Sequence, residues 1–213
     1  MRAGLLGPYE HALVAMTPLS LLDADGRVLP LDVARFLAPV NDADISVIER
    51  CRGPVLDVGC GPGRFVSALA ERGIPTLGVD LAPTAVRLAR GRGGSALRRD
   101  VFSRLPGEGR WPTILLVDGN VGLGGDVSRL FARIGRLLAP GGRLLVETEP
   151  HDCDERLHVR FHQHGQPIGE HFPWARVGPR DACRLAAAAG LRVVGFWTTH
   201  GRTFVELQMP GAA

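Results

Sequence analysis

A carboxylate followed by three closely spaced glycines is the pattern in this chain that is best suited to chemistry. Asp57 lies in the apolar segment PVLDV (54–58), and Gly59, Gly61 and Gly63 follow it. Glycine lets the backbone approach a ligand closely, and the start of a following helix favours electron-rich ligand groups. An ionised carboxylate that ends an apolar strand needs a cationic partner, unless Asp57 is only a turn residue. We therefore predict that this segment binds a ligand with a positive group near Asp57.

Three further acids follow apolar segments in the same manner. They are Asp80 in TLGVD (76–80), Asp100 in RRDVF (98–102) and Asp118 in TILLVD (113–118). Ligands of open α/β sheets bind beyond the carboxyl ends of the strands, where such acids would lie. Simpler roles are a helix cap for Asp80 and a solvated strand end for Asp100.

The elements that would position these acids alternate between apolar runs and helical periodicity. This alternation, from about residue 53 to 149, is typical of βαβ units and a parallel sheet. We expect strands at 54–58, 76–80, 96–102 (an edge strand), 113–118 and 143–149. The expected helices carry Phe65 and Leu69, start near Pro83, or are capped by Asp126.

Both ends of the chain depart from this alternation. We expect an N-terminal helical cap in residues 1–50, with helical patterns around 32–37 and 43–50, and one domain from 51 to 213. Within that domain, 151–178 reads as an insertion that would lie over the site where a substrate, the acceptor of a transferred group, binds. After it, Asp181 opens an Ala-rich helix that Gly190 closes, and 191–207 reads as a hairpin turning near His200 and Gly201.

The segment VLDVGCGPGR (55–64) resembles the acidic first motif of class I S-adenosylmethionine-dependent methyltransferases. Its glycines run G-x-G-x-G, whereas dinucleotide-binding dehydrogenases show G-x-G-x-x-G. LLAPGGRLLVE (137–147) is also similar to this family, and the resemblance covers about 53–149. It implies an α/β fold with a Rossmann-like, seven-stranded, mostly parallel sheet, helices on both faces and an antiparallel C-terminal hairpin. It implies S-adenosylmethionine as the cofactor.

The resemblance also implies roles for individual residues. Asp57 would meet the amino group of the cofactor, Asp80 both ribose hydroxyls, and Asp100 with Val101 the adenine. Gly119 and Asn120 would face the methyl group, whereas Cys60 reads as a packing residue and not as a nucleophile. The expected cofactor residues are Asp57, Gly59, Cys60, Gly61, Gly63, Asp80, Leu81, Asp100, Val101, Asp118, Gly119 and Asn120.

A histidine-rich segment, residues 151–171, contains five of the seven histidines. In a strand at 156–164, the histidines and arginines would share one face and Leu157, Val159 and Phe161 the other. Three readings stay open. His151 and His162 could be catalytic bases or part of a clamp for an anionic substrate, or the polar face could be solvated or contact another subunit. A metal site is the third reading, but the neighbouring arginines oppose a cation, and no metal is expected.

Composition and motifs narrow the methyl acceptor. All 25 basic residues are arginine and the net charge is only +3, so the charge does not by itself indicate nucleic acid. The absence of lysine excludes the RNA ribose enzymes of the Lys-Asp-Lys-Glu type, and DGNV (118–121) lacks the prolines and the aromatic residue of DNA amino-methylating enzymes. We expect a small-molecule acceptor and no DNA. The alternatives are a protein or RNA methyltransferase, a catalytically silent S-adenosylmethionine-binding module and, more distantly, a nicotinamide enzyme.

Scattered cysteines and the absence of a long apolar run bear on location. The four cysteines form no CxxC pair, which fits a reducing compartment. No signal-like N-terminus or run of about 18 apolar residues is present. The sequence therefore predicts a cytoplasmic protein that does not bind membranes.

Overall fold

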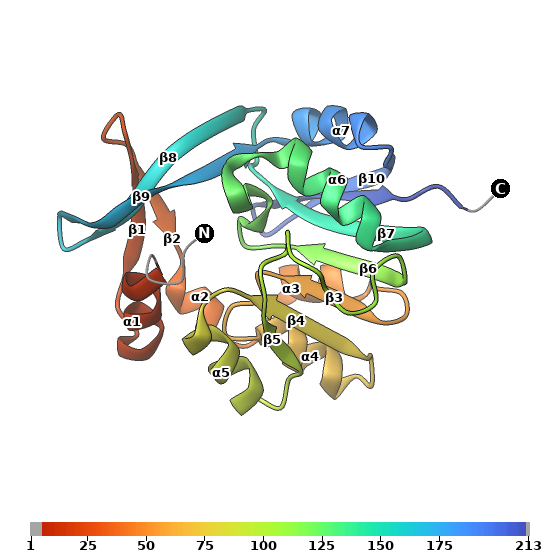
Figure 1. Cartoon of the computed structure of the whole chain (residues 1–213), viewed down its shortest axis with the longest axis horizontal. Coiled ribbons are helices and arrows are strands. Elements are labelled where there is room, and N and C mark those ends of the chain that lie inside the picture. The colour runs from red at the N-terminus through yellow and green to blue at the C-terminus, as the bar shows by residue number, and fades with distance from the viewer. Residues whose placement is uncertain (1–5, 212–213) are drawn as a thin grey trace.

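A seven-stranded sheet forms the centre of the computed structural model, which describes residues 6–211 (Figure 1). The strand order is β10-β11-β7-β6-β3-β4-β5. The strands are β3 (Val55–Val58), β4 (Thr76–Asp80), β5 (Ala96–Arg98), β6 (Trp111–Leu116), β7 (Leu138–Thr148), β10 (Arg192–Thr199) and β11 (Arg202–Gln208). Strands β3 to β7 are parallel, whereas β11 pairs antiparallel with β7 and β10. The predicted mostly parallel sheet with its C-terminal hairpin is confirmed.

The order of the sheet reverses at β3. From this strand the chain builds outward through β4 and β5 on one side, and through β6 and β7 on the other. Such a reversal leaves a crevice beyond the carboxyl ends of the central strands. Asp57 pairs with Gly78 of β4 and Leu115 of β6, so these three strands end at the same edge.

Helices cover both faces of the sheet because its strands are apolar on both sides. One face packs on α3 (Asp42–Ile48) and α4 (Arg64–Glu71), and α5 (Pro83–Gly91) packs on α4 and β5. The other face packs on α6 (Val127–Leu137) and α7 (Pro179–Ala188). Odd and even positions of the strands supply the two cores, as in Leu115 with α4 and Leu116 with α6.

A second sheet of four strands lies beside the carboxyl edge of the large sheet (Figure 1). We call it the auxiliary sheet; its order is β2-β1-β8-β9. Its strands are β1 (Leu19–Asp23), β2 (Val28–Leu31), β8 (Asp154–Gln163) and β9 (Gln166–Val177). The helices α1 (Gly7–Ala15) and α2 (Val33–Leu37) flank its N-terminal half. The N-terminal segment thus contains the two expected helices, α2 and α3, and also helix α1 and a hairpin that were not predicted.

The residues that begin, cap and turn individual elements lie mostly where the sequence predicts them. Pro83 begins α5, the side chain of Asp126 caps α6, and the last hairpin turns at His200 and Gly201. The predicted start of α7 at Asp181 is wrong. The helix begins at Pro179, because proline fits the first helical position, and Asp181 lies within the first turn.

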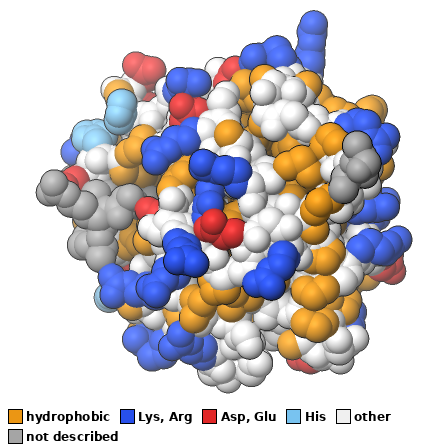
Figure 2. All heavy atoms as spheres, turned by 45° about the vertical axis from the view of Figure 1, so that its right-hand side comes forward, with side chains coloured by type: hydrophobic (Ala, Val, Ile, Leu, Met, Phe, Trp, Pro, Cys, Tyr) orange, Lys and Arg blue, Asp and Glu red, His pale blue; other side chains and the backbone are white. Residues whose placement is uncertain are grey.

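The surface carries no continuous basic stripe on the face that Figure 2 shows. Basic side chains there are interspersed with acidic, hydrophobic and uncharged groups. Among residues 6–211, no helix is both long and apolar enough to cross a membrane.

Candidate functional site

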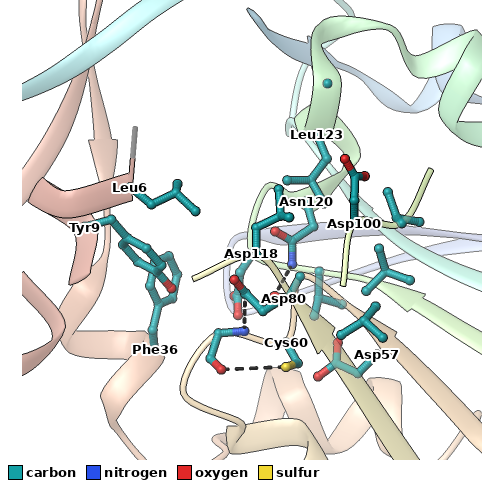
Figure 3. A pocket seen from close by; sticks show the side chains of 18 of the residues that line it. Leu6, Tyr9, Phe36, Asp57, Cys60, Asp80, Asp100, Asp118, Asn120 and Leu123 are labelled. Carbon is teal, nitrogen blue, oxygen red and sulfur yellow. Dashed lines mark hydrogen bonds between the residues drawn. The ribbon is translucent and has the colours of Figure 1, made fainter. Parts of the chain in front are cut away.

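A cavity opens at the carboxyl ends of β3, β4 and β6 (Figure 3). Its empty volume is about 1180 Å³, part of which is open to solvent. In Figure 3, Asp57, Asp80, Asp100 and Asp118 come from the side of the large sheet, and Leu6, Tyr9 and Phe36 stand on the opposite side. We call this space the main cavity.

Asp57 is a buried carboxylate without a partner on one oxygen. Its exposed fraction is 1%, and within residues 6–211 its Oδ1 atom forms no hydrogen bond. Burial, reinforced by the carboxylates of Asp118 and Asp80, raises its pKa to about 8. A buried polar atom without a hydrogen bond is unfavourable, so this position favours a cationic or hydrogen-bond-donating ligand group.

Asp80 presents a carboxylate that the backbone already orients. It accepts hydrogen bonds from the amides of Gly61 (2.9 Å) and Ala82 (2.8 Å). Burial raises its pKa, and these backbone hydrogen bonds oppose that rise. Each oxygen retains acceptor capacity, so the pair of oxygens can accept from two adjacent hydroxyl groups.

The glycines of the loop after β3 have different roles. A Cβ on Gly59 would lie 2.5–2.7 Å from side-chain atoms of Asn120, and one on Gly61 would lie 3.2 Å from the Tyr9 hydroxyl. Gly63 does not line the main cavity; there a Cβ would lie 2.6 Å from the Cβ of Ala89, so this glycine lets α4 pack against α5. Only the first two glycines therefore keep the ligand side of the loop open.

Hydrogen bonds within the loop use most of its amides. The amides of Gly59 and Cys60 donate to Val79, and that of Gly63 donates to Cys60. The loop therefore lets a ligand approach its backbone closely and presents carbonyl groups to it, but few free N–H donors. Burial raises the pKa of the Cys60 thiol, which matches its reading as a packing residue.

The remaining predicted cofactor residues lie around the same cavity, with one exception. Leu81, Asp100, Val101, Asp118 and Asn120 line it, and the side chain of Asn120 donates to the Gly59 carbonyl at 2.8 Å. Gly119 instead lines a second, neighbouring space.

Asp118 belongs to a buried network of ion pairs. It accepts hydrogen bonds from Arg64 at 2.7 Å and from Arg202 at 3.2 Å. Both arginines also contact Asp44, and Arg202 donates two hydrogen bonds of 2.7 Å to Glu147. Asp118 has a left-handed backbone, with φ of 58°. The network thus holds the chain at the end of β6 and leaves Asp118 no free charge for catalysis.

Apolar side chains form the wall opposite the acids. The auxiliary sheet, α1 and α2 contribute Leu6, Tyr9, Leu21, Leu31, Phe36, Phe161, Phe172 and Trp174. Three of these form an aromatic row, with ring centroids 5.1 Å apart for Phe161 and Phe172 and 6.4 Å apart for Phe172 and Trp174. Burial, with the nearby carboxylate of Asp80, raises the pKa of Tyr9 far above its usual value, so its hydroxyl stays protonated.

The second space, which we call the charged cavity, adjoins the main cavity. Leu31, Phe36, Asp118 and Trp174 line both of them. Its charged lining consists of Asp32, Arg35, Asp118, Glu147, Glu149, Arg176 and Arg202. The four shared residues therefore place these charges directly beside the main cavity.

The structure does not bring the predicted catalytic histidines to either cavity. His151 is exposed after β7, and the His162 ring lies 3.3 Å from the Ser20 hydroxyl on the outer face of the auxiliary sheet. His164 lies in the hairpin turn and not on the strand. In the described part of the chain, no three His, Cys, Asp or Glu side chains are grouped as metal ligands would be.

Several residues that line the cavities were not predicted as site residues. Trp174 packs against Gly122 and also lines both cavities. Arg64 directly follows the third glycine, a position that could have marked it. Tyr9 and Phe36 carry no comparable signal, because they reach the cavity only through tertiary packing of α1 and α2.

Sequence comparisons agree with this geometry. A family model described as a methyltransferase domain matches residues 27–195. Trans-aconitate 2-methyltransferase of Paracidovorax citrulli is 30% identical over 145 residues, covering 66% of this chain and 52% of the relative. A ubiquinone biosynthesis O-methyltransferase of Xanthomonas oryzae pv. oryzae is 31% identical over 136 residues, covering 59% and 54%. The chain thus spans about half the length of these curated relatives.

Solved structures show the same fold. A S-adenosylmethionine-dependent methyltransferase from Bacteroides fragilis, in complex with S-adenosylhomocysteine, superposes with a TM-score of 0.81 at 18% identity, covering 99% of this chain and 97% of that one. The 1,6-didemethyltoxoflavin N1-methyltransferase of Burkholderia thailandensis gives a TM-score of 0.59 at 21% identity, covering 79% and 77%.

Proposed function

Given that the chain belongs to the class I S-adenosylmethionine-dependent methyltransferase family, we propose that it transfers a methyl group from S-adenosylmethionine to a small-molecule acceptor. The main cavity supports this proposal, because it joins an acidic edge suited to a cationic nucleoside with an apolar space of its own. When bound, S-adenosylmethionine supplies a methyl group on a positively charged sulfur.

The residues at the acidic edge fit such a cofactor. The partnerless oxygen of Asp57 would accept from its amino group, and the oriented carboxylate of Asp80 would accept from its ribose hydroxyls. Asp100 and Val101 would lie beside the base. The open backbone at Gly59 and Gly61 leaves room between them. Within this edge, the single observation that carries the proposal is the buried, unpaired oxygen of Asp57.

Enclosure of the cavity supports a small acceptor over a protein or RNA. The wall that faces the acids comes from α1, α2 and the auxiliary sheet, and its side chains are largely buried. A macromolecular acceptor would need an open groove, and the face in Figure 2 shows no continuous basic one. The two curated relatives are named for trans-aconitate and for ubiquinone biosynthesis, which also supports a small organic acceptor.

The protein would act mainly by alignment and by exclusion of water. Trp174 and Phe36 line the boundary between the cavities and would orient an acceptor. His151 and His162 have no part in this proposed step, because neither lines either cavity.

The four cysteines form no disulfide, which supports a cytoplasmic location.

Calorimetric titration tests the cofactor directly. We expect S-adenosylmethionine and S-adenosylhomocysteine to bind and NAD not to bind. Asp57→Ala and Asp80→Ala should each weaken binding at least tenfold, whereas Asp25→Ala on the exposed β1–β2 turn should not. Binding of NAD alone, or unchanged binding by both cavity variants, would refute the proposal. Binding with no transfer to any acceptor would instead favour the silent binding module.

A further inference from the structure

Arg35 differs from the other arginines around the charged cavity in its partners. Arg202 is paired with Glu147, and Arg176 donates hydrogen bonds of 2.9 and 2.7 Å to Glu149. Within residues 6–211 the side chain of Arg35 forms no hydrogen bond, and its Nε atom is buried. Its Nη donors, which are not among the buried atoms, are therefore available to a ligand.

The acids nearest to Arg35 do not satisfy it. Asp118 lies 3.4 Å from its Nε atom but already accepts from Arg64 and Arg202. Asp32 lies 3.9 Å away, is half exposed, and caps α2 by accepting from the Arg35 amide. A planar guanidinium with five N–H donors in this setting suits an anionic oxygen.

The main cavity has two halves: an acidic half at the strand ends, and an apolar half formed by α1, α2 and the auxiliary sheet, which we call the acceptor half. In the acceptor half, Phe161 and Phe172 are each only 3% exposed. Among residues 6–211, no histidine lines the main cavity, the Tyr9 hydroxyl stays protonated, and Asp118 is held by two arginines. In the described part of the chain, the acceptor half thus offers no group suited to remove a proton from a neutral hydroxyl. In the charged cavity, Glu147 and Glu149 are already paired with Arg202 and Arg176.

Resting on the proposed function, we propose that the acceptor has an apolar body and one acidic oxygen group, a carboxylate or an acidic hydroxyl, and that Arg35 binds this group in its ionised form. A lone pair of that oxygen forms the bond to the methyl carbon, and the electron pair of the broken carbon–sulfur bond stays on sulfur. Since the oxygen arrives ionised, no proton has to be removed. Arg35 makes hydrogen bonds to the charge, and the row of Phe161, Phe172 and Trp174 contacts the apolar body.

Matched probes test the head group. Octanoate, 1-octanol and octylamine are titrated into the protein saturated with S-adenosylhomocysteine. Octanoate should bind at least tenfold more tightly than the alcohol or the amine, because a hydrogen bond to a charged group is worth about 1.5–3 kcal/mol, a factor of roughly 10–150. The acidic-hydroxyl alternative is tested in the same way: 4-nitrophenol, the more acidic phenol, should bind more tightly than 4-methylphenol. The apolar body is tested by butyrate, which should bind more weakly than octanoate by about two- to fourfold per CH₂ group.

Variants assign the effect to Arg35. R35Q should lose at least tenfold in octanoate affinity and leave 1-octanol and S-adenosylhomocysteine binding unchanged, which also shows that the variant is folded. R136Q, on the exposed face of α6, is the matched control and should change nothing. The proposal fails if the alcohol or amine binds as tightly as the acids, if R35Q keeps its octanoate affinity, or if no probe binds while S-adenosylhomocysteine does. Failure of S-adenosylhomocysteine itself to bind would refute the proposed function instead.

Discussion

The Nη2 atom of Arg64 lies 2.7 Å from each carboxylate oxygen of Asp118. The same guanidinium contacts Asp44, which has no exposed surface. Arg64 thereby connects α3, α4 and the end of β6 beneath the main cavity.

Removal of this arginine should destabilise the whole domain. Arg64→Met leaves Asp44 and Asp118 with fewer cations in a buried setting, and breaking a buried pair typically costs about 3–5 kcal/mol. Urea unfolding measures the loss. Arg184→Ala, which breaks ion pairs of a side chain that is 58% exposed, should destabilise the protein far less, because solvent screens exposed ion pairs. Equal losses for the two variants would contradict a structural role of the buried network.

Cofactor affinity should depend on pH through Asp57. Below its pKa of about 8, this carboxyl is protonated in the free protein and must lose the proton to pair with an ammonium group. Affinity should therefore rise by up to about tenfold per pH unit from pH 6 towards 8. Calorimetry in buffers of different ionisation enthalpy should detect up to one proton released per bound ligand. Asp57→Asn should bind weakly at every pH without proton release, and a pH-independent wild type would contradict the prediction.

Stability of the ligand-free protein should respond to pH in the opposite sense. The folded pKa of Asp57, about 8, lies above its usual value of 3.8, so the unfolded chain ionises first as the pH rises. The contribution of Asp57 to stability is therefore greatest below pH 4 and is lost progressively up to about pH 8. Asp57→Asn should be more stable than the wild type at pH 8, with a Tm higher by about 2–4 °C per kcal/mol. A lower Tm at pH 8 would refute this.

Alanine substitutions should separate the two roles of the loop glycines. Gly63→Ala places a Cβ 2.6 Å from the Cβ of Ala89 at a φ of 84°, so strain and overpacking together should cost about 2–5 kcal/mol. Gly73→Ala, with a φ of 70° and nothing within 4 Å, isolates the strain at about 1–2 kcal/mol. Gly59→Ala, at a φ of 75°, should carry the same strain as Gly73→Ala, and its Cβ would also displace the Asn120 side chain, which lines the main cavity, so cofactor binding should fall as well. Thermal melts and calorimetry distinguish these outcomes, and adding Asn120→Ala should restore space at Gly59.

The histidines of the insertion should be dispensable for turnover. His151→Gln and His162→Gln alter side chains outside both cavities, so kcat should stay within about twofold of the wild type. Steady-state assays with a methyl-labelled donor would measure kcat once an acceptor is identified. A loss of a hundredfold or more in either variant, as expected for a general base, would contradict the structure-based placement.

The acidic edge was predictable because its signals are local. Each acid follows an apolar strand, and the carboxyl ends of parallel strands meet, so Asp57, Asp80 and Asp100 converge on one cavity. The alternation in β8 likewise predicted two faces. It did not indicate which face the protein would use: the chemistry of the histidines favoured the polar side, whereas Phe161 of the apolar side lines the cavity.

The opposite wall was not predictable, because its partners are distant in the chain. β1 and β2 are short, and Pro30 within β2 argues against a strand in the sequence alone. These strands are stabilised by pairing with β8, in which Phe161 lies opposite Leu21 of β1. The sequence of β1 and β2 alone does not reveal this pairing. The sequence did not single out Arg35 for the same reason. Only the folded structure shows that, within residues 6–211, the neighbouring arginines are hydrogen-bonded to carboxylates and that the Arg35 side chain is not.

The pairing of β1 with β8 has a consequence for synthesis on the ribosome. Ser20 and His162 meet across 142 positions of chain, so the N-terminal hairpin emerges long before its neighbour exists. Until then β1 presents a bare strand edge, a feature that invites association with other chains. The apolar wall of the main cavity therefore forms only after the residues of β8 have been made, and the free edge of β1 stays open to other chains until then.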